Sequence, residues 1–146
     1  MLTAYNSDIV AWSKEQSYLL RSGNLSDIDI EHIAEEIEEV GKSEQRELAN
    51  RMTVLMMHLL KWYFQPARQG SSWEKTIKEQ RQSIIRRFKN TPSLKKSLID
   101  NEWLADVWLD ARLAAEKETQ IDFDKFPDEC PWEMDSILKE EWLPAT

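Results

Sequence analysis

The sequence predicts an all-α protein, a single-domain helical bundle of four to five helices with a long central helix and an irregular C-terminal segment. Three observations support this prediction. The 146 residues include only three Gly and five Pro, which favours long helices. Residues 52–64 are apolar in every direction at the helical spacing, as expected of a rod that its neighbours cover on several sides. No segment alternates apolar and polar residues as a half-buried strand would.

Two helices are expected in the N-terminal part of the chain. The first covers residues 7–22 and ends at Gly23, which can adopt the left-handed conformation of a C-terminal cap. Ser26, Asp27 or Asp29 can cap the second by accepting a backbone N–H. The second carries an apolar face about 120° wide. Its members are Ile30, Ile33, Ile37, Val40, Leu48, Met52, Leu55 and Leu59.

The apolar face of this second helix keeps its phase through Gly41. One continuous helix of roughly 35 residues is therefore expected, although Gly41 costs about 1 kcal/mol relative to Ala. Two helices broken at Gly41-Lys42-Ser43 are the alternative.

Two further helices and an irregular segment complete the predicted bundle. Pro66 and Gly70 end the long helix, and a third helix follows from about Ser71 with an apolar face. The inward residues of this face are Trp73, Ile77, Ile84 and Phe88. A fourth helix is expected from Pro92 to about Glu118. Pro127 and Pro131 then forbid a continuous helix, and Pro131 can open a short one. Because no linker separates two parts, residues 1–146 are expected to form one domain.

Composition limits the compartment and the class of protein. The N-terminus lacks a basic region followed by an apolar one, so no signal peptide is expected. The apolar run of residues 52–64 is shorter than the roughly 20 residues that cross a bilayer, so no contact with a membrane is expected. Cys130 has no second cysteine to pair with, which favours a reducing, cytoplasmic location.

The net charge of −8 conceals a basic block in the middle of the chain. Residues 61–96 carry ten Lys or Arg and two Glu, a net charge of +8, so the rest of the chain carries −16. Four cations of this block share one face of the third helix: Lys75, Lys78, Arg86 and Lys89. They are candidates for binding nucleic acid or another polyanion. The competing interpretation is that acidic segments of the same chain, or of another subunit, neutralise them.

A cluster of acids on the second helix is the candidate metal site. Glu35, Glu36 and Glu39 lie together with His32 on the side away from the isoleucines. The spacing resembles half of the acidic motif of all-helical nucleoside triphosphate pyrophosphohydrolases, in which carboxylates hold magnesium. The second half of that motif is absent, because no carboxylate occurs between Glu47 and Glu74. A solvated acidic face is therefore the favoured interpretation.

His58 and Lys61 are one turn apart on the central rod and could share a polar cleft. A partly buried histidine bonded to a carbonyl or carboxylate is favoured over a ligand or general base. The chain has no P-loop, no Gly-rich dinucleotide loop and no zinc spacing of Cys and His. No cofactor and no small-molecule substrate can therefore be inferred, and a non-enzymatic role is favoured.

Several motifs spread along the chain resemble those of one bacterial family. They are Ala11-Trp12…Glu15-Gln16, Asp29-Ile30-Glu31…Glu35-Glu36-Ile37, Gly41-Lys42-Ser43-Glu44, His58-Leu59-Leu60-Lys61-Trp62, Trp73…Thr76-Ile77…Gln80-Arg81 and Phe126-Pro127…Cys130-Pro131-Trp132. In these motifs the chain resembles domain-of-unknown-function family 29. The resemblance implies an all-helical fold and carries no activity or ligand onto particular residues.

Together these observations favour a small cytoplasmic helical protein that acts through protein contacts, with a partner protein or as a homodimer. Seven Trp and a methionine-rich rod supply more large apolar groups than four helices are expected to hide. Binding of nucleic acid or another polyanion through the third helix is the first alternative. A metal-dependent hydrolase that uses Glu35, Glu36 and Glu39 is the second.

Overall fold

The computed structural model describes residues 2–145, and every regular element in that range is a helix. Five α-helices follow one another in this range: α1 (Ile9–Arg21), α2 (Ile30–Phe64), α3 (Ser71–Asn90), α4 (Asn101–Thr119) and α5 (Met134–Ile137). The 3-10 segments between them are η1 (Leu25–Asp27), η2 (Pro66–Arg68), η3 (Pro92–Ile99) and η4 (Phe123–Lys125). The predicted all-α class with a long central helix is confirmed. The described residues form two compact units, one ending at Glu44 and the other beginning at Gln45.

The N-terminal unit contains α1, η1 and the first turns of α2. The Asp8 carboxylate caps α1 by accepting the backbone N–H groups of Val10 and Ala11, both at 3.1 Å. Gly23 follows the helix with a φ of 77°, so the predicted left-handed position is confirmed. Asp29 caps α2, because its Oδ1 accepts the backbone N–H of His32 at 3.3 Å.

The long helix α2 is continuous for 35 residues, and the alternative of two helices broken at Gly41 is wrong. A Cβ added at Gly41 would meet nothing within 4 Å, so no close packing forces a bend there. The predicted apolar face, however, is buried only from Leu48 onward. Ile30, Ile37 and Val40 are 69%, 67% and 68% exposed, because no described element packs over them.

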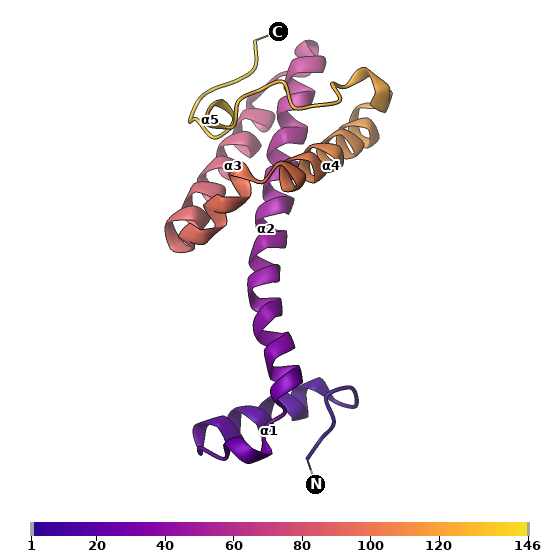
Figure 1. Cartoon of the computed structure of the whole chain (residues 1–146). Helices are drawn as coiled ribbons and strands as arrows, with labels where there is room; N and C mark the ends of the chain where they lie inside the picture. Colours follow the sequence, from indigo (N-terminus) through magenta and orange to yellow (C-terminus); the bar gives the residue numbers. More distant parts are fainter. Residues whose placement is uncertain (1, 146) are drawn as a thin grey trace. The chain divides into compact units, whose positions relative to one another are not determined.

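The C-terminal unit is built around the second half of α2, as the rod of residues 52–64 predicts. Helices α3 and α4 lie against this half of α2 in Figure 1. Five apolar side chains of the rod are at most 1% exposed: Met52, Leu55, Met56, Leu59 and Leu60. They form one core with residues of α3 and α4, which include Ile77, Ile84, Phe88, Val107 and Trp108. Burial of this apolar surface is the main stabilising term of the unit.

The C-terminal unit differs from the sequence prediction in its fourth helix and agrees with it in the irregular segment that follows. The predicted fourth helix is divided, because η3 ends at Ile99 and the Asp100 carboxylate caps α4 by accepting the N–H groups of Glu102 and Trp103. The irregular segment after α4 runs to the C-terminus, as expected. It is anchored in the core by Phe126 and Ile137, at 2% and 0% exposure.

Candidate functional site

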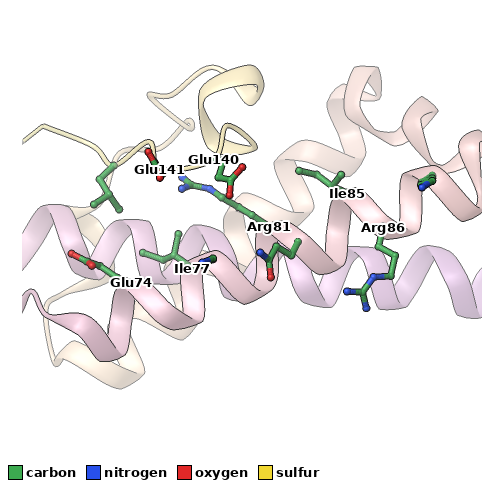
Figure 2. Close-up of a pocket in the computed structure, with 11 residues that line it drawn as sticks. Glu74, Ile77, Arg81, Ile85, Arg86, Glu140 and Glu141 are labelled. Atoms are coloured by element: carbon green, nitrogen blue, oxygen red, sulfur yellow. The ribbon is translucent and has the colours of Figure 1, made fainter.

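A groove of about 750 Å³ lies between α3 and the segment that follows α5 (Figure 2). Helix α3 supplies one wall with Glu74, Ile77, Lys78, Arg81, Gln82, Ile85, Arg86 and Lys89. The C-terminal segment supplies the other wall with Glu140, Glu141 and Leu143. At the helical spacing the α3 residues share one face, next to the stripe that is buried in the core. The same helix therefore anchors the core and lines the groove.

Arg81 holds the second wall of the groove in place. The side chain is only 4% exposed. Its Nε donates to the carbonyl of Ile137 at 2.8 Å, and its Nη2 donates to the carbonyl of Trp142 at 2.5 Å. Burial lowers the pKa of Arg81. Because both acceptors belong to the C-terminal segment, one guanidinium ties this segment to α3.

Sequence reasoning counted Arg81 only as part of the basic block and missed this role. Arg81 follows Ile77 by four residues and precedes Ile84 by three. This spacing places it on the inward face of α3, which was the available signal. A cation on an inward face must find acceptors, because an unpaired buried charge is costly.

The charges of the groove are unevenly distributed along α3. Glu74 is near the N-terminal end of the helix, with Glu140 and Glu141 above this half in Figure 2. Arg86 and Lys89 line the groove near the C-terminal end of α3. The buried Ile77 and the half-exposed Ile85 lie between the two ends. The groove thus combines apolar side chains, Ile85 and Leu143, with an acidic end and a basic end.

Three of the four residues predicted to bind a polyanion line this groove. Lys78, Arg86 and Lys89 belong to it, and Lys75 is an exposed residue of α3 outside it. The competing interpretation from the sequence named the acidic segments Glu35–Glu47 and Glu116–Glu141 as partners of the basic block, and Glu140 and Glu141 of the second segment do line the groove. Because the C-terminal segment has no helical period, the sequence gives no signal for its position.

His58 and Lys61 lie close to each other in the C-terminal unit, and their partners come from packing contacts. The Lys61 Nζ is 2.8 Å from the Glu118 Oε2 and 4.8 Å from the ring centroid of Trp73. The hydrogen bond from Lys61 lowers the pKa of Glu118. Burial lowers the pKa of His58, and its Nδ1 donates to the carbonyl of Val54 at 2.9 Å. These contacts join α2 to α3 and α4.

The acids of the candidate metal site lie on the first turns of α2. Glu35 and Glu39 are exposed, and Glu36 accepts a hydrogen bond from the Tyr5 hydroxyl at 2.5 Å. This bond is the main reason that the pKa of Tyr5 is raised to about 12. Within residues 2–145, no three His, Cys, Asp or Glu side chains are grouped so that they could hold a metal ion.

A second polar cluster lies beside Glu36 in the N-terminal unit. The Tyr5 ring stacks on His32 with 4.2 Å between centroids. The Asp29 Oδ2 is 2.7 Å from the His32 Nδ1 and 3.1 Å from the Trp12 Nε1 that donates to it. Burial raises the pKa of Asp29, but the hydrogen bonds from His32 and Trp12 outweigh it, so the net pKa is lowered. The cluster ties α1 to the start of α2.

Cys130 offers little as a nucleophile. The side chain is half-buried, and its Sγ donates to the carbonyl of Trp132 at 3.5 Å. Burial raises the pKa of the thiol, which disfavours the reactive thiolate. None of the helices between residues 2 and 145 combines the length and the apolar character that a membrane span requires.

In the part of the chain that the structure describes, the protein is all-helical and carries a groove along α3. The family profile described as Domain of unknown function DUF29 matches residues 4–143. The chain therefore belongs to this family, and the resemblance seen in its motifs is confirmed. No curated protein and no solved structure matches the chain significantly.

Proposed function

We propose that this protein is a non-enzymatic interaction module whose groove along α3 docks an amphipathic, acidic helix of a partner protein. The observation that supports this proposal is the combination of the apolar lining residues Ile85 and Leu143 with exposed cations, which are Lys78, Arg86 and Lys89. An amphipathic helix in a groove inserts its apolar side chains and pairs its flanking charges with the rim. The groove offers both kinds of contact.

The dimensions of the groove suit a short helix. Glu74 and Lys89 are 15 residues apart on α3. At about 1.5 Å per residue they span roughly 22 Å, the length of about four helical turns. Ile85 is 50% exposed and offers an apolar contact within this span. A docked helix would cover it.

Binding of nucleic acid or another polyanion is the second candidate function. The exposed cations of α3 favour it, because positive charges along one helix can follow a phosphate backbone. The carboxylates of Glu74, Glu140 and Glu141 in the same groove oppose it, since they would repel phosphates. A helix with acidic flanks meets the same carboxylates, but its apolar face can also contact Ile85 and Leu143 of the groove, whereas a polyanion makes no use of these apolar residues. We therefore prefer the protein partner.

The experiment uses a labelled helical peptide of about 15 residues, with Leu along one face and Glu on both flanks. We expect wild-type protein to bind this peptide and not its Lys-flanked counterpart, as measured by fluorescence anisotropy. The variant R86E/K89E should weaken binding about tenfold or more, because like charges then meet across the groove. The matched control is K95E/K96E, which changes two exposed lysines of η3 outside the groove and should bind as wild type does.

Absence of peptide binding to the wild type would overturn the proposal. If the wild type instead binds duplex DNA at low salt, and both double variants weaken that binding equally, the polyanion function is supported. Binding through phosphate contacts should weaken in proportion to the number of cations removed anywhere on the surface. Binding of a docked helix should weaken only when groove residues are changed.

A metal-dependent hydrolase that uses Glu35, Glu36 and Glu39 is the third candidate function. The three side chains belong to one stretch of α2, and Glu36 would have to leave Tyr5 to bind a cation. Elemental analysis of the purified protein and a magnesium-dependent triphosphate hydrolysis assay test this function. If the protein is an interaction module, we expect elemental analysis to find no bound metal and the assay to find no triphosphate hydrolysis.

The lone Cys130 supports a reducing, cytoplasmic site for the proposed interaction. Fractionation of cells that express the tagged full chain tests this location. Recovery in the soluble cytoplasmic fraction is expected, and recovery elsewhere would contradict it.

A further inference from the structure

The two ends of the groove along α3 carry opposite charge. The end near the start of α3 has three exposed carboxylates, which are Glu74, Glu140 and Glu141. The other end has two exposed cations, Arg86 and Lys89. Lys78, one turn after Glu74, offsets part of the negative charge and leaves the first end acidic. A ligand that lies along the groove therefore meets both signs of charge in a fixed order.

Arg81 fixes the position of the acidic pair Glu140 and Glu141. Its buried guanidinium binds the carbonyls of Ile137 and Trp142, which precede and follow this pair in the sequence. Both carboxylates are therefore carried by a short loop that is held at each end, as Figure 2 shows. The acidic end is part of the folded structure, so its charge is already in place before a ligand binds.

The backbone of Glu141 supports a role for its carboxylate. Glu141 has a φ of 68°, in the left-handed region that is unfavourable for residues other than Gly. Glycine would suit this backbone better, so the conformation does not explain why a glutamate is present. Within residues 2–145, no ion pair involves Glu141. Its carboxylate is thus available to a ligand of the groove.

We infer that the helix docked in the groove carries glutamates in one half and lysines in the other. This inference rests on the proposed function and specifies the charge order of the partner. The glutamates lie over Arg86 and Lys89, and the lysines lie over the acidic end. A helix with glutamates along its whole length would place some of them against Glu140 and Glu141, which is unfavourable.

The groove also favours one direction for the docked helix. A helix is stabilised by acidic residues near its N-terminus and basic residues near its C-terminus. A partner with this order runs antiparallel to α3, with its N-terminus toward Lys89. Arg81, which holds the acidic loop, is eight residues from Lys89, or about 12 Å along α3. This distance is about two helical turns, so the two halves of a 15-residue helix reach the two ends of the groove.

The experiment compares two labelled peptides of about 15 residues with the same composition and the same Leu face. The segregated peptide has Glu in its N-terminal half and Lys in its C-terminal half, whereas the mixed peptide interleaves them. Fluorescence anisotropy at low salt should show that wild-type protein binds the segregated peptide about fivefold or more tightly, because several opposite charges pair. Circular dichroism checks that the two peptides are equally helical.

The variant E140K/E141K/R86E/K89E exchanges the charges of the two ends and keeps the total charge. It should still prefer the segregated peptide but bind it in the opposite direction. A nitroxide on the N-terminus of the peptide reports this direction in NMR spectra of the protein. It should broaden amide signals near residue 89 in the wild type and near residues 140 and 141 in the variant.

Two further variants separate charge order from folding. K95E/K96E changes exposed lysines of η3 outside the groove and should retain the wild-type preference for the segregated peptide. E141G should not lower the midpoint of thermal unfolding, because Gly accommodates a φ of 68°. It should nevertheless reduce the preference for the segregated peptide, because one carboxylate of the acidic end is removed.

The outcomes separate this inference from the proposed function. Equal affinity for the segregated and mixed peptides would overturn the charge order, and the proposed function would stand if the Glu-flanked peptide still binds. Broadening of the same amides in the wild type and the exchanged variant would also overturn it. Failure of all three peptides to bind would overturn the inference and the proposed function together.

Discussion

Replacing Arg81 with Ala should detach the C-terminal segment from α3 and destroy the groove. The guanidinium donates two hydrogen bonds to carbonyls of that segment, and hydrogen bonds from charged donors contribute about 1.5 kcal/mol each or more. The expected loss of stability is therefore about 3 kcal/mol. The carbonyl of Ile137 also loses its partner, and that residue is 0% exposed. Unless the segment opens to water, this group adds to the cost.

Hydrogen exchange and urea unfolding measure this effect. In R81A, amides of residues 134–143 should exchange much faster than in the wild type, while those of α2 keep most of their protection. Binding of the acidic peptide should be lost with the second wall. R86A is the matched control for stability and hydrogen exchange only, because Arg86 lies on the same helix but is exposed. R81A with stability within about 0.5 kcal/mol of the wild type and unchanged exchange would refute the reasoning.

Three further predictions concern the N-terminal unit. G41A should raise stability by about 0.5–1 kcal/mol, because a Cβ at this position meets nothing within 4 Å. G23A should lower stability, because Gly23 has a φ of 77°, which is unfavourable for Ala. Thermal unfolding of both variants checks that the two changes have opposite signs. The folded-state pKa of Asp29 is lowered, so the ionised carboxylate should stabilise the fold above about pH 4. This stabilisation should be lost as the pH falls through the lower folded-state pKa. Acid titration of Trp fluorescence should show this step in the wild type and not in D29N. One tyrosine should ionise near pH 12 in ultraviolet titration, and E36Q should lower the pKa of Tyr5 toward 10; a wild-type chain whose tyrosines all ionise near 10 would contradict the Tyr5–Glu36 bond.

The sequence predicted the core better than the surface. Residues 52–64 are apolar all round, and a helix of this kind must be covered, so its burial followed directly from the pattern. Ile30, Ile37 and Val40 continue the same apolar face, yet they are exposed. Helical periodicity indicates which side chains share a face, but it does not indicate whether another element covers that face. For this reason the pattern predicted the buried rod, but it did not predict that the apolar face of the first turns of α2 is exposed.

The groove could be predicted only in part, for a related reason. The exposed cations of α3 and the inward position of Arg81 follow from helical spacing. The opposite wall depends on where an irregular segment crosses the core, and this is fixed by tertiary contacts such as the Arg81 bonds to Ile137 and Trp142. Local sequence patterns do not encode such contacts. The separation of η3 from α4 at Asp100 has a local cause instead. The Asp100 carboxylate accepts the backbone N–H groups of Glu102 and Trp103, and an Asp in this position can begin a new helix.

The basic block of residues 61–96 is divided by the structure into two groups of cations. One group pairs within the chain: Lys61 contacts Glu118 at 2.8 Å and Arg87 contacts Glu47 at 3.3 Å. Within residues 2–145, no ion pair involves Arg86 or Lys89 of the groove. Internal neutralisation therefore accounts for only part of the charge asymmetry, and the remaining cations are available to a partner. Contacts made by this second group should weaken with added salt more than the partly buried Lys61 pair does, because exposed charges are screened more strongly.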